Sequence, residues 1–235
     1  MTLRIREAPS PNHDARPDGT PIDTLVLHYT GMRTAEEAIL RLRDPEAAVS
    51  SHYVVEEDGT IWRLVPEERR AFHAGISHWR GREALNGRSI GIEIVNPGHE
   101  WGYRPFPALQ MAAVCDLCLE ILARHPIAAR DVVAHSDIAP DRKQDPGELF
   151  DWEGLAANGV GLWPRGVPGE DAALPADGTA RALRLLGAIG YRTDLPPALL
   201  LTAFQRHWRP ERVDGLADAG TLARLEAVAR LCEGD

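Results

Sequence analysis

The sequence predicts an α/β fold: a mixed central β-sheet flanked by helices, with a small three-helix domain at the C-terminal end. Three observations carry this prediction. Up to about residue 150, apolar strand-like runs alternate with segments of helical periodicity, as in a sheet covered by helices. Residues 165–178 are rich in Pro, Gly and acidic residues, which is typical of a linker. Because the composition then shifts to Ala, Leu and Arg, we expect one domain over residues 1–164, a linker at 165–178 and a helical domain over 179–235.

The first expected elements lie in the N-terminal third of the chain. Residues 23–30 contain an apolar run bounded by polar residues, which indicates a buried strand. Residues 34–43 have helical spacing, and Thr34 with Glu37 has the pattern of a capping box. In residues 51–66, two strand-like runs flank Asp58-Gly59, which is the strongest short signal for a β-hairpin.

The remaining elements follow the same alternation. Residues 89–96 and 131–135 have the apolar, β-branched composition of strands. Residues 107–125 form the longest expected helix, with an apolar side made of Leu109, Ala113, Leu117 and Ile121. The C-terminal domain contains three short helices, expected at residues 179–189, 197–208 and 216–231.

Charge and hydropathy exclude some classes of partner. The chain has 235 residues, 44% of them hydrophobic, and a net charge of −9. Phosphate binding needs a basic surface, so we expect no nucleic acid partner. No apolar run approaches the roughly 18 residues of a membrane-spanning helix, so we expect no membrane span. The polar N-terminal segment lacks the apolar stretch of a secretory signal, which favours a cytoplasmic location. A periplasmic location is the alternative if a signal or lipobox has been removed.

Cys115 and Cys118 form a CxxC motif, which can indicate metal or redox chemistry. The motif lies within a helical pattern, MAAVCDLCLEIL, that has no nearby Gly or Pro turn. Because free cysteines are often fully buried, we interpret both as thiols of a helix core. Uncrosslinked thiols also favour a reducing compartment.

Two polar side chains interrupt apolar strands. His28 lies near the end of the strand at residues 23–30; taken alone, such a histidine is usually a hydrogen-bonded core residue. In the strand at 89–96, alternation places Glu93 on the face opposite to that of Ile90, Ile92 and Ile94. A carboxylate in a central strand is costly to bury without a partner or a chemical role, whereas in an edge strand it is simply solvated.

Residues 135–147, HSDIAPDRKQDPG, concentrate ionisable side chains in a loop that contains two prolines. His135 ends a short strand, as His28 does. Lys143 and Asp145 are two residues apart, so in an extended segment both project to the same side. The alternative is a solvated acidic loop with a salt bridge. We interpret the other two acidic residues before Lys143, Asp137 and Asp141, as loop structure or solvated charge.

Taken together, His28, His135 and Asp145 form a three-ligand set that leaves one coordination position open. This is the pattern of a catalytic zinc site, in which water is the fourth ligand. Glu93 would then accept a proton from that water and pass it to a leaving group. Lys143 would stabilise the oxyanion of a tetrahedral intermediate. The two histidines are far apart in the sequence, so no local motif supports the set by itself.

The chain resembles the zinc-dependent N-acetylmuramoyl-L-alanine amidases, the amidase 2 family of AmpD and AmiD type, in five ordered segments: VLHYT, SSHYVV, FHAGISHW, SIGIEIVNP and AHSDIAPDRKQDPG. The similarity covers roughly residues 20–164. It implies the fold that this family shares with peptidoglycan recognition proteins. It also implies hydrolysis of the amide between N-acetylmuramic acid and L-alanine of the stem peptide, in muropeptides or other peptidoglycan fragments.

The resemblance implies roles for individual residues. The positions of the family's zinc ligands match His28, His135 and Asp145. The catalytic acid/base and the catalytic lysine match Glu93 and Lys143. The cofactor implied is Zn²⁺.

Three further residues are candidates for binding the muropeptide: Tyr29, His73 and Trp79. His73 and Trp79 fit core packing equally well. Tyr29 follows the first ligand, as in the AmiD type, whereas the AmpD type typically has Asn there. We therefore expect 1,6-anhydro sugars and also reducing sugars to be accepted.

The C-terminal segment resembles a small peptidoglycan-binding domain through LRLLGAIGY, LTAFQRHW and VDGLADAGT. A plain helical bundle that packs on the first domain is the alternative. Two other functions also stay open. One is a recognition protein that binds peptidoglycan without cleaving it, although such relatives typically lose metal ligands. The other is a phage-type lysin that acts on intact cell wall.

Overall fold

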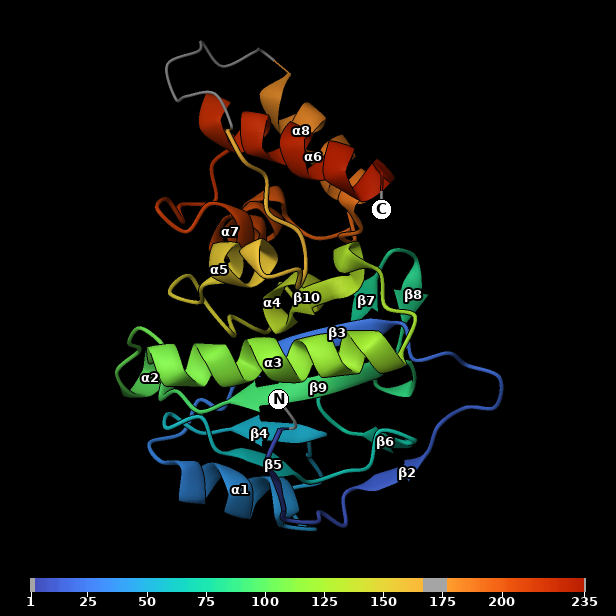
Figure 1. The fold of residues 1–235 in the computed structure, drawn as a ribbon. Helices are drawn as coiled ribbons and strands as arrows, with labels where there is room; N and C mark the ends of the chain where they lie inside the picture. Colours follow the sequence, from blue (N-terminus) through green and yellow to red (C-terminus); the bar gives the residue numbers. More distant parts are fainter. Residues whose placement is uncertain (1–2, 167–176, 235) are drawn as a thin grey trace.

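A computed structural model of the chain describes residues 3–166 and 177–234. Its centre is a six-stranded mixed sheet flanked by helices, as the sequence predicts (Figure 1). The strands lie in the order β1 (Ile5–Glu7), β5 (Ile61–Arg63), β4 (Tyr53–Val55), β9 (Ser89–Ile94), β3 (Thr24–Tyr29) and β10 (Val132–Ala134). β4 and β5 pair antiparallel, and the other neighbours in this sheet run parallel.

The two central strands carry one predicted site residue each. β9 lies between β4 and β3, so Glu93 is not on an edge strand. β3 and β9 are parallel, with His28 opposite Glu93. Paired residues of neighbouring strands point to the same side of a sheet, so these two side chains share a face. The opposite face is apolar and contains Leu25, Leu27, Ile90, Ile92 and Ile94.

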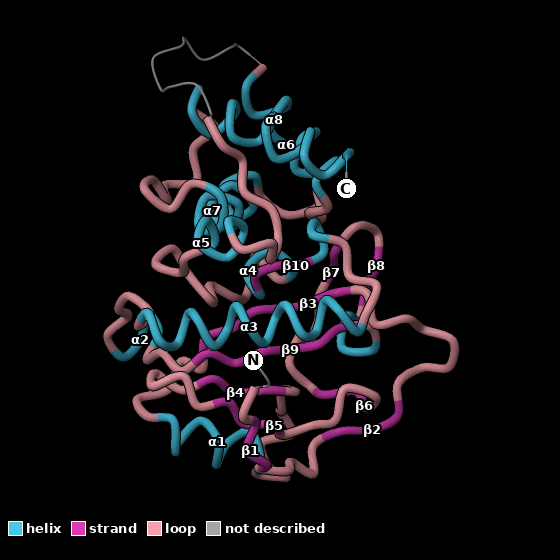
Figure 2. The backbone as a smooth tube through the Cα atoms, in the orientation of Figure 1, coloured by secondary structure: helices cyan, strands magenta, loops and turns pink. Residues whose placement is uncertain are grey.

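Helix α3 (Ala108–Arg124) covers this apolar face, as Figures 1 and 2 show. The helix is confirmed, but the prediction for its first turn is wrong. Leu109 is 70% exposed, whereas Gln110 is fully buried. Gln110 Nε2 donates to the carbonyl oxygens of Val55 and Val95, at 3.1 and 2.8 Å. A buried amide can satisfy these two buried acceptors, which a leucine could not.

The CxxC motif lies within α3, as expected. Cys115 and Cys118 are both free thiols. Cys118 is fully buried in the core beneath the helix, while Cys115 is half-buried at its margin. Burial raises the pKa of both thiols. The core interpretation therefore holds fully for Cys118 and in part for Cys115.

The hairpin and the first helix form at the predicted positions, and the Thr34 half of the predicted capping box is present. Gly59 adopts a φ of +84° in the turn between β4 and β5, and Asp58 Oδ1 accepts from the backbone N–H of Thr60 at 2.8 Å. Helix α1 (Ala35–Arg43) begins after Thr34. The Thr34 hydroxyl accepts from the backbone N–H of Glu37 at 3.1 Å, which satisfies one unpaired donor of the first turn.

Apart from β4, β5 and β10, which lie within longer strand-like runs, the sequence does not predict the short elements. Each has two to six residues, too few for a hydrophobic period to be recognised. Besides β1, they are β2 (His13–Ala15), β6 (Arg69–Ala71), β7 (His78–Trp79), β8 (Arg82–Glu83), α2 (Gly98–Trp101), α4 (His135–Ile138), α5 (Trp152–Ala157) and 3-10 turns at Leu85–Gly87 and Ala129–Asp131. The expected loop at 135–147 therefore begins with one helical turn, α4.

The three predicted C-terminal helices are α6 (Gly178–Ile189), α7 (Pro197–Trp208) and α8 (Ala219–Gly234). They lie beyond β10 and α4 in Figure 1, and their apolar side chains form one cluster with side chains of the sheet. Leu186 and Phe204, for example, belong to the same cluster as Val26 and Val133. Most of the expected linker, residues 167–176, lies outside the described residues, so the domain boundaries stay a prediction. No helix in residues 3–166 or 177–234 has the length and apolar character to cross a membrane.

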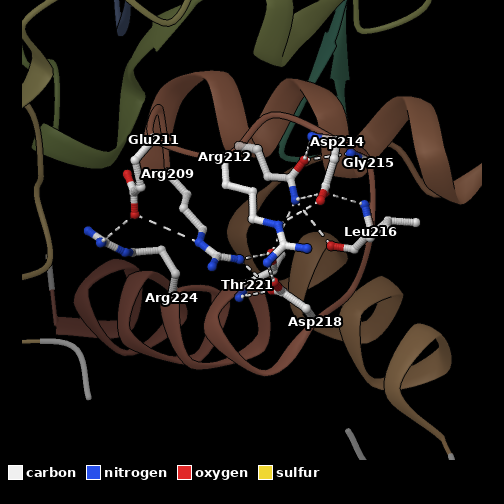
Figure 3. A network of polar contacts seen from close by, with 10 residues as sticks. Arg209, Glu211, Arg212, Asp214, Gly215, Leu216, Asp218, Thr221 and Arg224 are labelled. Carbon is white, nitrogen blue, oxygen red and sulfur yellow. Dashed lines mark hydrogen bonds and ion pairs between the residues drawn. The ribbon is translucent and has the colours of Figure 1, made fainter. Parts of the chain in front are cut away.

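Polar contacts fix the turn between α7 and α8 (Figure 3). Arg209 is buried, pairs with Asp218 and donates to Thr221 Oγ1 at 2.8 Å. Gln205 Oε1 accepts from the backbone N–H of Asp214 at 3.0 Å. These contacts account for the polar residues of VDGLADAGT and hold the start of α8 against α7.

Candidate metal centre and active site

The structure brings the three predicted ligands together. His28 Nδ1 lies 2.9 Å from His135 Nδ1 and 3.0 Å from Asp145 Oδ2. His135 Nδ1 lies 2.9 Å from the same carboxylate oxygen. All three side chains are buried. They come from the end of β3, the start of α4 and the following loop, which meet at the carboxyl-terminal ends of the parallel strands β3 and β10.

This donor set fits one small divalent cation. Donors bound to a tetrahedral zinc ion at about 2.0–2.1 Å lie roughly 3.3 Å apart, close to the separations found here. Two nitrogens and one carboxylate oxygen also leave a fourth position open. The chain therefore holds a buried His/His/Asp set of the kind that binds metal.

A chain of hydrogen bonds orients His28 toward this point. His28 Nε2 lies 3.0 Å from His73 Nδ1, and His73 Nε2 lies 3.0 Å from Ser89 Oγ. The Ser89 hydroxyl donates to the carbonyl oxygen of Leu85 at 2.7 Å, so it must accept from His73 Nε2–H. His73 Nδ1 then accepts from His28 Nε2–H. This leaves the Nδ1 lone pair of His28 facing the other two ligands, as metal binding requires.

His135 and Asp145 are held by backbone contacts. His135 Nε2 lies 3.3 Å from the carbonyl oxygen of Ala74, so its Nδ1 is also free to bind a cation. The backbone N–H of Ser136 donates to the carbonyl oxygen of Asp145 at 3.0 Å, which ties the segments of the second and third ligands together.

The electrostatics of the ligands suit cation binding. Burial and the nearby His135 lower the pKa of His28 to about 4, so its imidazole is neutral near pH 7. Burial opposes ionisation of Asp145. In the absence of a metal, the interactions with His135 and His28 outweigh it and hold the pKa of Asp145 well below its usual range, so its carboxylate is available to a cation.

Glu93 lies beside this centre, opposite His28 in the neighbouring strand. Nothing in residues 3–166 or 177–234 hydrogen-bonds to its Oε2, which is inaccessible to solvent. Burial and the charge of Asp145 raise the pKa of Glu93 well above its usual value, although the charge of Lys143 acts in the opposite direction. An unpaired carboxylate with a raised pKa beside a cavity is a candidate for proton transfer.

A cavity of about 370 Å³ extends from His135 and Asp145 to helix α1. Glu93 and Lys143, the two predicted catalytic residues, line it. Further lining comes from residues that the sequence does not single out, including Arg41, Phe72, Arg142 and Gln144. Arg41 lies on the polar side of α1, and no sequence signal distinguishes it from a solvated arginine.

The three candidate substrate contacts occupy different positions. Tyr29 and His73 line the cavity. Trp79 does not: it is 2% exposed, and its Nε1 donates to Asp131 Oδ1 at 3.1 Å. Its ring packs edge-on against Tyr191 of the C-terminal part, with 5.1 Å between centroids. The packing alternative therefore describes Trp79, because apolar side chains of sheet and C-terminal helices enclose its indole.

The fold and the donor set define a candidate metal-dependent hydrolase, and comparison with known proteins agrees. The family model for N-acetylmuramoyl-L-alanine amidase matches residues 18–148. The N-acetylmuramoyl-L-alanine amidase AmiD of Escherichia coli (strain K12) is 41% identical over 230 residues, which cover 88% of this chain and 82% of AmiD. The chain belongs to the N-acetylmuramoyl-L-alanine amidase family.

Solved structures extend the similarity to the whole fold. A complex of E. coli AmiD with anhydro-N-acetylmuramic acid-L-Ala-D-γ-Glu-L-Lys superposes with a TM-score of 0.81 at 40% identity and covers 91% of both chains. AmpDh3 from Pseudomonas aeruginosa, in complex with anhydromuramic pentapeptide, gives 0.78 at 33% identity over 90% of this chain and 93% of its own. The 1,6-anhydro-N-acetylmuramyl-L-alanine amidase AmpD of E. coli (strain K12) is 37% identical over 63% of this chain and 87% of AmpD.

Proposed function

We propose that this chain uses zinc to hydrolyse the amide between the lactyl group of N-acetylmuramic acid and L-alanine of the stem peptide. The observation that carries the proposal is the meeting of His28, His135 and Asp145 beside a cavity that Glu93 and Lys143 also line. The solved relatives that contain anhydromuropeptides support this substrate class. Turnover or recycling of peptidoglycan is the process that supplies such fragments.

Zinc is the ion we propose for the buried ligand set. Two neutral imidazoles and one carboxylate with an open fourth position are typical of catalytic zinc sites. When bound, zinc would lower the pKa of a coordinated water and polarise the scissile carbonyl.

Glu93 is the residue we propose for proton transfer. It would accept a proton from the attacking water and deliver it to the departing nitrogen of L-alanine. The Glu93 side chain lines the cavity, and none of the described residues binds its Oε2. Its raised pKa lies closer to neutral pH, where one carboxyl group can act as both base and acid.

Lys143 is the residue we propose for charge stabilisation. It lines the same cavity as Glu93, His135 and Asp145, and its positive charge lowers the pKa of Glu93. There it would stabilise the negative oxygen of the tetrahedral intermediate. Of the substrate-contact candidates that line the cavity, we propose Tyr29 for the muropeptide, because both ring nitrogens of His73 are engaged with His28 and Ser89.

Incubation with a purified anhydromuropeptide and its reducing counterpart tests this function. We expect the zinc-loaded protein to release the stem peptide from both, and mass spectrometry of the products to identify the lactyl–L-alanine bond as the one broken. If the zinc-bound protein releases no peptide from the anhydromuropeptide and none from its reducing counterpart, the proposal is contradicted. Binding without release would indicate a recognition protein, and activity confined to intact cell wall would indicate a lysin. The cytoplasmic location stays a prediction, which cell fractionation tests.

A further inference from the structure

The carboxylate of Asp137 connects the His135 segment with the C-terminal helices. Asp137 is buried, and its side chain is 0% exposed. Tyr191 donates its hydroxyl to Oδ1 at 2.5 Å, and His207 Nδ1 lies 2.6 Å from Oδ2. An ionised carboxylate can only accept hydrogen bonds, so His207 Nδ1 is the donor. Tyr191 follows α6 and His207 lies in α7, so both partners come from the C-terminal part.

Asp137 also shapes the turn that carries the second metal-ligand candidate. Its Oδ2 accepts from the backbone N–H of Ala134 at 2.8 Å. Ala134 is the last residue of β10 and His135 is the first of α4. The carboxylate therefore closes the turn on which His135 stands. Since Ser136 N–H binds the carbonyl oxygen of Asp145, a shift of this turn would also reach the third ligand.

Helix α7 makes a second contact with the same loop. Arg206 Nη2 donates to Gln144 Oε1 at 3.1 Å, and Arg206 Nε lies 3.6 Å from a carboxylate oxygen of Glu148. Gln144 stands between Lys143 and Asp145 in the sequence and lines the cavity. The C-terminal part thus contacts the loop on both sides of its functional residues.

His207 is itself held rigidly. Its ring stacks between Trp152 and Trp208, with centroid distances of 3.8 and 3.9 Å and interplanar angles of 24° and 11°. The His207 side chain is 1% exposed. Because the imidazole lies between two indoles, the plane of its ring is fixed, and in this position Nδ1 contacts Asp137.

We propose that the C-terminal helices position the metal-ligand loop, with Tyr191 and His207 acting through Asp137. The inference rests on the proposed metal site and adds a role that the resemblance to a peptidoglycan-binding domain does not include. A buried carboxylate that loses its partners is strongly destabilising, because its charge is left uncompensated. Without Tyr191 and His207, Asp137 turns toward water and releases Ala134 N–H, and His135 loses its orientation.

Two conservative substitutions test this. Tyr191→Phe removes one hydroxyl, and His207→Phe keeps a flat ring between the indoles but removes the donor. We expect the double variant to bind zinc about 10-fold more weakly than wild type, the lower end of the range for residues that orient ligands. We also expect a lower kcat with little change in KM, because the cavity lining stays in place. Zinc affinity is measured by chelator competition well below the unfolding temperature, where all proteins are folded.

Leu225→Ala is the matched control. Leu225 is fully buried among the C-terminal helices, and its apolar side chain can form neither a hydrogen bond nor an ion pair with Asp137, so its truncation destabilises the same helices through a cavity. We expect this variant to unfold at lower temperature and to keep wild-type zinc affinity. If the double variant retains wild-type affinity, or Leu225→Ala weakens zinc binding equally, the positioning role is wrong. The single variants decide the question if the double variant fails to fold. Failure of the wild type to bind zinc would instead contradict the proposed function.

Discussion

His73 lies so close to Gly91 that a Cβ atom on Gly91 would be 2.4 Å from His73 Cγ. Gly91 belongs to β9, which pairs with the strand that carries His28. The missing side chain provides the space in which the His73 ring reaches His28 Nε2. Gly91 is therefore required by packing, and through His73 it affects the orientation of a metal-ligand candidate.

Gly91→Ala should weaken metal binding. The methyl group displaces His73, so His28 loses the acceptor for its Nε2–H. We expect zinc affinity to fall about 10- to 100-fold, the range for residues that orient metal ligands. Overpacking should also lower the free energy of unfolding by about 1–3 kcal/mol. Chelator competition and denaturant unfolding measure the two effects.

Ile90→Val separates these effects, because Ile90 is in the same strand but on the opposite face. It should cost about 0.5–1.5 kcal/mol of stability with no change in zinc affinity. Wild-type zinc affinity in Gly91→Ala would show that His73 does not orient His28.

Two substitutions of His73 test the hydrogen bond itself. Asn can place its Oδ1 near the position of Nδ1 and still accept from His28 Nε2–H, whereas Leu offers no acceptor. We expect His73→Leu to weaken zinc binding by about 10-fold or more, and His73→Asn to retain most of the affinity. Both variants lose the contact with Ser89, so their difference isolates the bond to His28. Equal affinities for the two variants would mean that His73 acts only by filling space.

The sequence predicts the main strands and the helices because each contains a full hydrophobic period. The resemblance to the amidase motifs, together with the position of His28 near the end of a strand, also predicts that His28 and Asp145 meet. Only the strand order, which is a property of the whole sheet, excludes the edge-strand alternative for Glu93. Leu109 is exposed and its neighbour Gln110 is buried, because the buried carbonyl groups of Val55 and Val95 require a donor.

Asp137 illustrates what sequence patterns cannot contain. Its place in the sequence indicates loop structure or solvated charge; the residue does shape the loop, but it is buried and not solvated. Its partners, Tyr191 and His207, lie 54 and 70 residues further along the chain. A tyrosine just after one helix and a histidine within the next give no signal that they bind a particular carboxylate. The burial of Trp79 depends on the same packing of the C-terminal helices.

Glu93→Gln should separate catalysis from metal binding. Glutamine keeps the shape of the side chain but cannot accept and return a proton. We expect kcat to fall about 10²- to 10⁴-fold, as for loss of a general base, with unchanged zinc content. Asp145→Ala is the contrasting variant and should lose both zinc and activity. Turnover of Glu93→Gln close to the wild-type rate would exclude Glu93 as the proton carrier.

The buried histidines predict that the metal-free protein loses stability in acid. Burial and the nearby His135 lower the pKa of His28 to about 4, and burial with the charge of Arg16 lowers that of His52 to about 3. In the unfolded chain both titrate near pH 6.5, so between pH 6.5 and 4 the unfolded state binds more protons. The free energy of unfolding should therefore fall as pH falls through this window, by up to about 1.4 kcal/mol per pH unit for each histidine.

The titration of Glu93 changes the free energy of unfolding in the opposite direction, and a variant without this titration provides the control. The pKa of Glu93 is raised by burial, so its protonated form favours the folded state and that stability is lost as pH rises above the usual carboxyl range. Glu93→Gln removes this contribution, and we expect the metal-free variant to lose stability more steeply on acidification than wild type. His52→Asn should make the loss shallower, because one buried histidine no longer titrates on unfolding. Denaturant unfolding across this pH range, with chelator present, measures all three slopes. A free energy of unfolding that stays constant or rises on acidification of Glu93→Gln would contradict the argument.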